Sequence, residues 1–287
     1  MFEGLKKVYE EKYKLLMLIP FLLLFLSIVQ IGFQYAQTGE FMHRGVSLKG
    51  GISVAVPNHF MPTHDLELIL LKEFPNGDIS VRSIADTGLL IDASDVSQEE
   101  LIKALEKQFG KLDDYSVGEI GSSLGDSFFK ETFFALLLAF LFMGIVVFIT
   151  FRVPIPSLAV ILAAFSDIVV TLAVVNVLGF KMSSAGIAAF LMLIGYSIDT
   201  DILLSTRVLK RKEGTVMDRV HGAIKTGMTM TTTTLVALIA GLLISNSDTI
   251  FQIMFILFIG LMVDMPMTWI QNVGLLRWYL EKKGVQK

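Results

Sequence analysis

The sequence contains no cysteine, which excludes a disulfide-stabilised fold. Charged residues make up only 18% of the 287 residues, against roughly 25% in a typical soluble domain. The net charge of -3 provides no field that would attract nucleic acid, so we expect no nucleic-acid partner. Hydrophobic residues instead make up 53%, and the mean hydropathy is +0.66. Because a water-soluble fold cannot bury that much apolar surface, the lipid bilayer must be the solvent for much of the chain.

Six apolar stretches are long enough to cross roughly 30 Å of hydrocarbon, which takes about 20 helical residues. They cover residues 15–33, 132–151, 155–178, 182–204, 227–244 and 250–273. The first is longer than the apolar part of a signal peptide and lacks a small-x-small cleavage site, so we expect it to remain as an anchor. The sequence therefore predicts an α-helical membrane protein with six transmembrane helices.

The predicted organisation has four parts. They are a cytoplasmic amino terminus with the first helix (1–33), an outer domain (34–131), helices two to six (132–273) and a carboxyl-terminal tail (274–287). Lysine and arginine near the span ends set the orientation. They concentrate in the two termini and in the loop between spans four and five: Lys6, Lys7, Lys12, Lys14, Arg207, Lys210, Arg211, Lys212, Arg219, Lys225, Arg277, Lys282, Lys283 and Lys287. Arg152, in the turn between spans two and three, completes this side, whereas the short connections on the other side hold only Lys181 and Asp248.

This asymmetry predicts a multi-pass protein of the cell membrane with both termini in the cytoplasm and residues 34–131 outside it. The basic loop between spans four and five is best explained as a topology signal that touches anionic membrane lipids. A docking surface for a partner is the alternative.

The outer stretch is polar enough to fold in water. Its periodicity predicts strands over 52–56, 78–84, 87–93 and 115–120, with helices over 62–74 and after Ser97, which begins a capping box. The order β-α-β-β-α-β is that of a ferredoxin-like α+β domain. Helices would cover one face of an antiparallel sheet and leave the other available for contact.

No residue pattern in this domain indicates catalysis or a bound group. His43, His59 and His64 lack the spacing of a metal site, so we expect no metal, no cofactor and no enzyme activity. Two glycine-rich stretches, 45–51 and 118–125, lack the spacing of a phosphate-binding loop. We interpret them as backbone turns where the chain enters and leaves the sheet.

Four acids inside the spans are the informative residues. Asp167 lies at about the midpoint of the third span, Asp264 slightly cytoplasmic of the midpoint of the sixth, and Asp199 and Asp201 in the cytoplasmic half of the fourth. An ionised aspartate at a helix centre costs roughly 2.5–3.5 kcal/mol. Such residues usually face the bundle interior and mark proton or ion routes, and burial favours the proton-bound form that a carrier needs. The alternative is a set of hydrogen-bonded acids that lock the helices together.

Helix geometry separates the two acids of the fourth span. Asp199 shares a face with Gly195 and Tyr196, whereas Asp201 lies about 200° away. Gly195 would allow a neighbouring helix to approach closely, so Asp199 is the predicted interior acid. Asp201 lies near the basic loop, and we expect it to pair with Arg207 or Arg211 at the level of the lipid headgroups.

A threonine-rich stretch follows in span five. The hydroxyls of Thr229 and residues 231–234 are expected to bond their own helix carbonyls, or alternatively to solvate a carboxylate across a helix interface. Lys225 at the cytoplasmic mouth is a candidate counter-ion for an acid on a neighbouring span.

Three motifs resemble those of a known family. Residues 194–201, which read Ile194-Gly195-Tyr196-Ser197-Ile198-Asp199-Thr200-Asp201, are similar to the I-G-Y-S-I-[ND]-[DT] stretch of the SecF family in the resistance-nodulation-division (RND) superfamily. Residues 45–51 are similar to that family's G-I-D-F-x-G-G, with Ser47 in place of Asp. Asp167 with Thr171 is similar to its D-x-x-x-T. The layout of one span, a small outer domain and five spans also fits.

The resemblance implies a function and partners. SecF subunits work with a SecD-type subunit and a SecYEG-type channel, and are thought to use the proton gradient to pull the translocating preprotein outward. Three departures from the bacterial pattern resemble the archaeal form: Thr200 at the position of the key acid, Thr226 in place of an arginine, and Asp264 at a usually small position.

The predicted function is thus a non-enzymatic export subunit in which Asp167, Asp199, Asp264 and Asp201 are the proton-relay candidates. One alternative is a proton-driven RND exporter of small amphiphiles or lipids, although the chain shows no internal repeat and about 98 outer residues leave little room for a pocket. The other alternative is an assembly scaffold that does not use the gradient.

Overall fold

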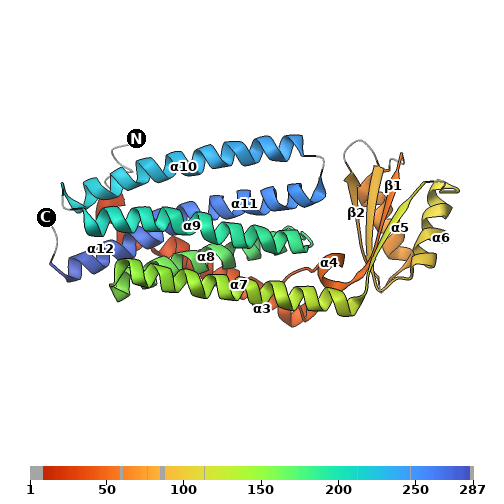
Figure 1. Cartoon of the computed structure of the whole chain (residues 1–287), viewed down its shortest axis with the longest axis horizontal. Coiled ribbons are helices and arrows are strands. Elements are labelled where there is room, and N and C mark those ends of the chain that lie inside the picture. The colour runs from red at the N-terminus through yellow and green to blue at the C-terminus, as the bar shows by residue number, and fades with distance from the viewer. Residues whose placement is uncertain are drawn as a thin grey trace.

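The computed structural model describes residues 9–58, 61–75, 77–84, 88–112, 114–211, 213–245 and 247–284. A long helical bundle carries a small sheet domain at one end, and α12 lies at the other (Figure 1). Predictions that involve Lys6, Lys7, His59, Lys212 and Lys287 fall outside the described residues.

Six helical segments of the described chain are long and apolar enough to span a membrane. The first combines α2 (Tyr13–Leu16) with α3 (Leu18–Thr38), and the next four are α7 (Ser122–Phe151), α8 (Pro154–Val177), α9 (Ser184–Lys210) and α10 (Val216–Ile244). The last combines α11 (Asp248–Pro266), the π-helix η2 (Met267–Asn272) and α12 (Val273–Lys282). The predicted six-span membrane protein is confirmed.

Local sequence explains where several of these helices begin. Ser183 caps α9 by accepting from the Ala185 N–H, and Thr215 forms a capping box with Asp218 at the start of α10. Pro154 occupies the first turn of α8, where its missing N–H has no helical partner to lose. These caps therefore fix the residue at which each of these helices begins.

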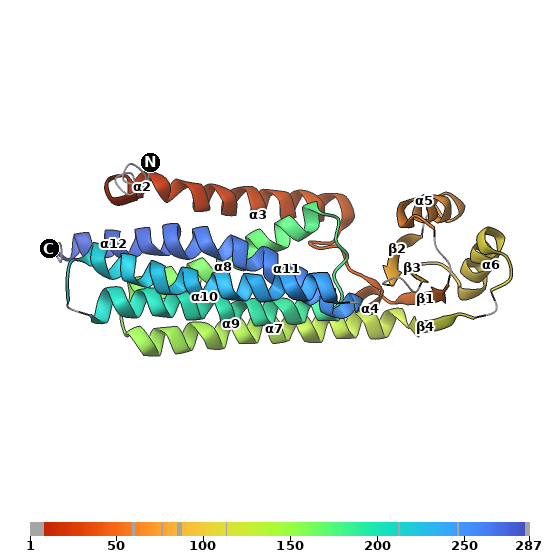
Figure 2. The ribbon, with the colours of Figure 1, turned by 90° about the horizontal axis from the view of Figure 1, so that it is seen from above.

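Burial identifies α8 and α9 as the centre of the bundle. About half of each is buried, whereas α3 and α7 expose most of their surface. Figure 2 shows α3 along one side of the bundle and α7 along the other. Because α9 packs against α7, α8, α10 and α11, its inward side chains can meet those of several helices at once.

The sheet domain contains β1 (Gly51–Pro57), α5 (Thr63–Glu73), β2 (Asp78–Ile84), β3 (Gly88–Ser94), α6 (Gln98–Phe109) and β4 (Ser116–Ile120). Its strands pair in the order β2-β3-β1-β4, and every pairing is antiparallel. This is the predicted β-α-β-β-α-β arrangement. Ser97 caps α6, and its hydroxyl accepts from the Glu100 N–H, as its sequence predicted.

The two faces of the sheet have different chemistry. Leu66, Leu70, Leu101 and Leu105 of the two helices are fully buried against one face. Polar residues of the other face line a cavity of about 240 Å³ together with residues from the near end of the bundle. Ser53, Ser80, Arg82 and Asp92 belong to this polar face.

Glycines allow the two chain passages between bundle and domain to touch. Gly50 has a φ of +88°, and a Cβ there would lie 2.5 Å from the Ser122 Cα at the start of α7. A Cβ on Gly125 would lie 2.5 Å from the Gly50 nitrogen. Both glycine-rich stretches therefore allow close backbone approach where the chain enters and leaves the sheet. They are not simple turns, because Val46–Lys49 form the short helix α4, and residues 118–125 contain the end of β4 and the start of α7.

Candidate functional site

Three carboxylates are fully buried inside the helical bundle. Asp167 on α8, Asp201 on α9 and Asp264 on α11 each have 0% exposed surface. Among the described residues no lysine, arginine or histidine side chain is buried with them. The site is thus a carboxylate cluster without a buried cation in the described part of the chain.

Hydroxyl and amide groups connect the three acids. Asn272 Nδ2 donates to Asp201 Oδ1 at 2.7 Å. Thr268 Oγ1 lies 3.0 Å from Asp201 Oδ1 and 3.0 Å from Asp264 Oδ1. Because a threonine hydroxyl has one proton, it can donate to only one of these two carboxylates at a time. A proton on the other carboxyl group, donated to the hydroxyl oxygen, would satisfy the second contact.

The remaining contacts extend the cluster to α8 and α9. The Ser197 hydroxyl donates to Asp167 Oδ2. Thr200 Oγ1 lies 3.3 Å from Asp264 Oδ2 and also donates to the Ser197 carbonyl at 2.8 Å. Both hydroxyl residues come from α9, which therefore contacts the acids of the two helices on either side of it.

Electrostatics limits how many of these acids can be ionised together. Like charges in a water-poor interior repel strongly, and an unpaired buried carboxylate also loses its hydration. Hydroxyl and amide donors relieve part of that cost but supply no opposite charge. Chemically, the arrangement can hold and release protons within the membrane-spanning part of the bundle.

The π-helix η2 supplies the polar groups that sequence reasoning missed. Thr268 and Asn272 contact the acids, and Gln271 Nε2 donates to Ser166 Oγ on α8 at 3.1 Å. Such π-helical turns are frequent at functional sites. The available signal was a proline inside an apolar span, Pro266, followed by polar residues three and four positions apart on one helix face.

The predicted placement of the two acids on α9 is wrong. Asp199 is exposed, whereas Asp201 is completely buried. Gly195 and Tyr196 are exposed with Asp199, and the exposed fraction of Tyr196 is 40%. The two acids do face opposite directions, as predicted. The error is in the inward face, which the position of Gly195 does not identify. The actual inward face carries Ser197, and Gly195 has open space around it.

Asp201 also makes no headgroup-level pair with the basic loop among the described residues. Arg207 donates instead to the Gly222 carbonyl at 2.5 Å and to Thr226 Oγ1 at 2.9 Å. The Arg211 carbonyl accepts from the Arg219 guanidinium. These basic side chains tie α9 to α10, and the buried acid instead bonds the neutral donors of η2.

The supporting candidates have mixed positions. Thr171 is fully buried one helical turn from Asp167, but its hydroxyl has no hydrogen-bond partner among the described residues. Lys225 is exposed, and no ion pair joins it to an acid in the described part of the chain. Three of the α10 threonines bond their own helix as predicted: Thr229 donates to the Lys225 carbonyl, and Thr233 and Thr234 to that of Met230. The buried Thr231 hydroxyl has no hydrogen-bond partner among the described residues.

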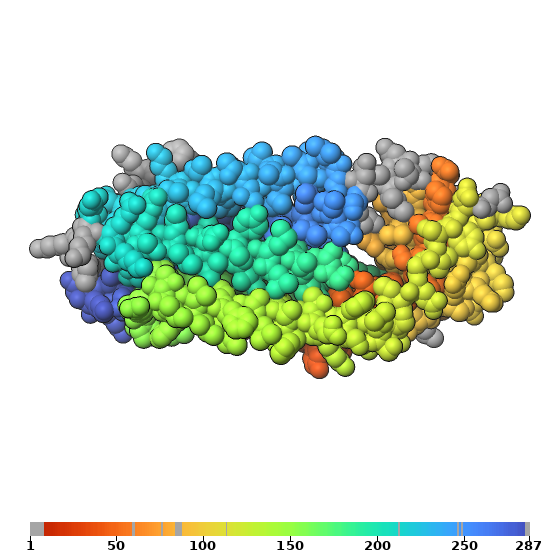
Figure 3. Space-filling view, in the orientation of Figure 1, coloured from red at the N-terminus to blue at the C-terminus, as the bar shows by residue number. Residues whose placement is uncertain are grey.

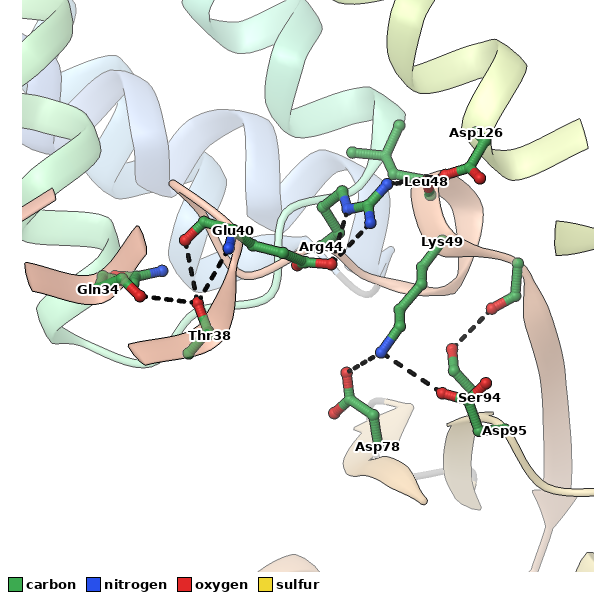
Figure 4. Close-up of polar contacts among 11 residues, drawn as sticks. Gln34, Thr38, Glu40, Arg44, Leu48, Lys49, Asp78, Ser94, Asp95 and Asp126 are labelled. Carbon is green, nitrogen blue, oxygen red and sulfur yellow. Dashed lines mark hydrogen bonds and ion pairs between the residues drawn. The ribbon is translucent and has the colours of Figure 1, made fainter. Parts of the chain in front are cut away.

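Ion pairs join the segment between α3 and β1 to the sheet domain on one side and to α7 of the bundle on the other (Figure 4). Lys49 lies 3.7 Å from Asp78 and 3.5 Å from Asp95. Arg44 pairs with Glu40 at 2.6 Å and with Asp126 at 2.9 Å. The hydrogen bond to Glu40 raises the pKa of the Arg44 guanidinium further.

Lys181 makes a direct contact from the bundle to the sheet. Its ammonium group donates to Asp78 Oδ1 at 2.5 Å and to the Ile79 carbonyl at 2.9 Å. Gln252 on α11 holds the same loop, because its Nε2 donates to the Lys181 carbonyl at 2.8 Å and its Oε1 accepts from Ser183. The loop between α8 and α9 therefore contacts both α11 and the sheet domain.

Several known proteins are similar to this chain. The family model for the SecD/SecF protein export membrane protein, C-terminal, matches residues 100–282. The protein-export membrane protein SecF of Pyrococcus furiosus is 36% identical over 98% of this chain and 96% of its own length. That of Methanocaldococcus jannaschii is 37% identical over 96% and 99%.

A solved structure gives the same fold. The crystal structure of SecDF, a translocon-associated membrane protein from Thermus thermophilus, matches 94% of this chain with a TM-score of 0.70 and 19% identity. This chain spans only 38% of that longer chain. The match of the family model together with the near full-length identity to archaeal relatives shows that the chain belongs to the SecF family of protein-export membrane proteins.

Proposed function

We propose that this chain works with a SecD-type subunit and a SecYEG-type channel, and uses the proton gradient to promote the outward movement of a translocating preprotein. The observation that carries the proposal is the cluster of Asp167, Asp201 and Asp264, buried without a cation among the described residues. In this mechanism the acids bind and release protons, and no covalent catalysis takes place.

The proton gradient is the energy source in this proposal. One proton that crosses 100 mV releases about 2.3 kcal/mol. Loading a proton onto the cluster removes a buried negative charge and its repulsion of the neighbouring acids, so the packing of α8, α9 and α11 changes with the protonation state. Those helices meet the loop that holds Lys181, which contacts Asp78 of the outer domain. Helix movement would therefore reach the domain through this contact.

We propose an orientation with the outer domain outside the cell and both chain ends in the cytoplasm. Arg207 and Lys210 lie in the last turn of α9, and Lys282 in that of α12, which places them at the bundle end away from the sheet. Positive residues favour the cytoplasmic side. A proton entering from outside would then reach the cluster from the domain side.

The exposed acid on α9 supports the SecD-type partner. Asp199 precedes Arg207 by eight residues, so it lies about 12 Å along the helix from the basic end. An aspartate exposed to hydrocarbon costs roughly 2.5–3.5 kcal/mol. A Cβ added to Gly195 would meet no other atom within 4 Å, which leaves room for another helix.

Asp199 lies on the exposed side of α9, and α9 lies between α7 and α10 on the face shown in Figure 3. We propose that membrane helices of the SecD-type subunit cover it and supply a hydrogen-bond donor for Asp199. A solved SecDF chain has more than twice the length that this chain covers, which leaves room for such a second unit.

The test is export of a preprotein into vesicles that contain this chain, its SecD-type partner and the channel, under an imposed proton gradient. We expect Asp167→Asn, Asp201→Asn and Asp264→Asn each to reduce the gradient-dependent export rate at least about tenfold, which corresponds to about 1.4 kcal/mol. Asp114→Asn, at an exposed position of the outer domain, is the matched control and should export normally.

Undiminished export by all three buried-acid variants would reject proton coupling and leave the scaffold function. Gradient-dependent release of a lipid or small amphiphile without any preprotein would instead support the exporter function. Export lost only in Asp199→Asn, together with loss of co-purification, would place the essential acid at the partner interface.

A further inference from the structure

The segment before the first span folds back onto the π-helix of the last span. Tyr9 Oη donates a hydrogen bond of 2.6 Å to the carbonyl oxygen of Trp269. Trp269 is the third residue of η2 and directly follows Thr268, which contacts two of the buried acids. A residue 260 positions away in the sequence is thus bonded to the backbone that presents the acid ligands.

Arg277 on α12 holds this segment in place. Its Nη1 donates to the Tyr9 carbonyl at 3.1 Å and its Nη2 to the Glu10 carbonyl at 2.8 Å. The guanidinium also lies 4.1 Å from the centre of the Tyr13 ring. The planar fork of arginine suits two such bonds to adjacent carbonyls, and it holds the backbone of Tyr9 at a position from which the hydroxyl reaches η2.

The Tyr9 hydroxyl keeps its proton under physiological conditions. Burial raises the pKa of the phenol, and the nearby Arg277 lowers it only in part. Other charged groups near the segment include Glu10, which lies 3.8 Å from His221 of α10, and the Lys14–Glu281 pair at 3.2 Å. The exposed Glu11 and Lys12 belong to the segment itself. Tyr9 can therefore act as a permanent donor to the Trp269 carbonyl.

We propose that Tyr9 is a positioning residue, which stabilises the π-helical register of η2 and thereby holds Thr268 and Asn272 against the buried acids. A π-helical turn is rarer than an α-helical one, so it requires support from outside the helix. Converting η2 to an α-helix would shift its register by one residue. The residues after that point would then rotate about the helix axis by about 100°. Asn272 would then leave Asp201, which it now contacts at 2.7 Å.

The effect of Tyr9 on the buried acids rests on the proposed proton-binding function. Its effect on the π-helical register of η2 does not, because that register can be measured separately. The Trp269 ring packs directly against α10, and a Cβ on Gly227 would lie 2.2 Å from its Cζ2. A change of register would move the ring away from Gly227. Trp269 fluorescence therefore reports the register, provided that Trp278, the only other tryptophan, is replaced by phenylalanine.

The experiment compares Tyr9→Phe with Tyr35→Phe, both in the Trp278→Phe background and in detergent micelles. Tyr35 is exposed on α3, and the loss of the same hydroxyl there is the matched control. The first measurement is acrylamide quenching of Trp269. The second is the pH dependence of labelling by dicyclohexylcarbodiimide, which reacts with protonated carboxyl groups in apolar surroundings, read by mass spectrometry of the peptides that contain Asp167, Asp201 and Asp264.

We expect Tyr9→Phe to increase quenching at least about twofold and to extend the labelling of Asp201 to higher pH by at least about half a unit, since the acid loses donors that favour its ionised form. The three acids face one another from α8, α9 and α11, and no described basic side chain is buried beside them. Arg277→Lys should change both measurements in the same direction, because lysine keeps the charge and loses the fork.

Quenching and labelling in Tyr9→Phe that match the Tyr35→Phe control would overturn the proposal. Increased quenching with unchanged labelling would also overturn it, because Tyr9 would then support the helix without positioning the acid ligands. If both measurements change as expected while the buried-acid variants export normally, the positioning role stands and the proposed proton coupling fails.

Discussion

Replacing Thr268 by valine tests whether the contacts within the acid cluster stabilise the bundle. The hydroxyl lies 3.0 Å from a carboxylate oxygen of Asp201 and 3.0 Å from one of Asp264, and the residue is fully buried. Valine has nearly the same shape, so the change removes the hydroxyl without opening a cavity. Thr268→Val therefore isolates the hydrogen bonds.

The expected loss of stability in Thr268→Val follows from the single proton of the Thr268 hydroxyl. One hydroxyl proton gives one donated bond, and a bond to a charged acceptor contributes about 1.5–3 kcal/mol. The acceptor that loses its partner stays buried, so we expect a loss of about 2–3 kcal/mol. For a chain of 287 residues, with an unfolding entropy of about 2.1 cal/mol/K per residue, that corresponds to a decrease in unfolding temperature of roughly 3–5 °C.

Thr171→Val provides the matched control. Thr171 is also a fully buried threonine of the bundle, but its hydroxyl has no hydrogen-bond partner among the described residues. Removing a buried polar group that lacks a partner is neutral or stabilising. Thermal unfolding in one detergent, followed by circular dichroism, should show a clear decrease for Thr268→Val and none for Thr171→Val. Equal unfolding temperatures for both variants would refute the claim that the Thr268 contacts are real hydrogen bonds.

Three further predictions address other parts of the molecule. Asp201→Asn should unfold at the same or a higher temperature than the unmodified protein at neutral pH, because the amide resembles a protonated acid; a large decrease would show that the ionised form is required for folding. Gly227→Ala should destabilise the bundle by about 1–3 kcal/mol, since its Cβ would lie 2.2 Å from the Trp269 ring; an unchanged unfolding temperature would contradict this contact. Asp78→Lys should broaden the distribution of distances between spin labels on the sheet domain and on the bundle, because it removes the 2.5 Å contact with Lys181; the exchange Asp78→Lys with Lys181→Asp should narrow that distribution again, and a distribution that stays broad would contradict the role of this contact.

Much of the architecture was predictable because it depends on local periodicity. The strand predicted over 78–84 has the same ends in the structure, and Ser97 caps its helix as expected. Alternation of buried and half-buried residues along β1 and the length of the apolar runs both leave a direct trace in the sequence. Fold class and the number of spans follow from such traces without knowledge of tertiary contacts.

The details of the acid site were not predictable in the same way. A π-helical turn depends on which neighbours bond the helix from outside, and for η2 one such neighbour is Tyr9, far away in the sequence. Pro266 marks an irregular span but does not determine its register. The hydrogen-bond roles of Thr268 and Asn272 therefore emerge only when the helices are packed.

The phase of α9 shows why an interior acid cannot be selected from one helix alone. Small residues favour close helix approach, and Gly195 marks a face where another helix fits, but in this chain that face is left open. Asp199 lies on it, while Asp201 faces α11 and η2 about 200° away. Glycine spacing therefore predicts that a contact exists without identifying whether the neighbour belongs to the same chain. Two acids separated by one residue on one helix can accordingly have different environments: Asp201 inside the proposed proton-binding cluster, and Asp199 on the face that we assign to the partner subunit.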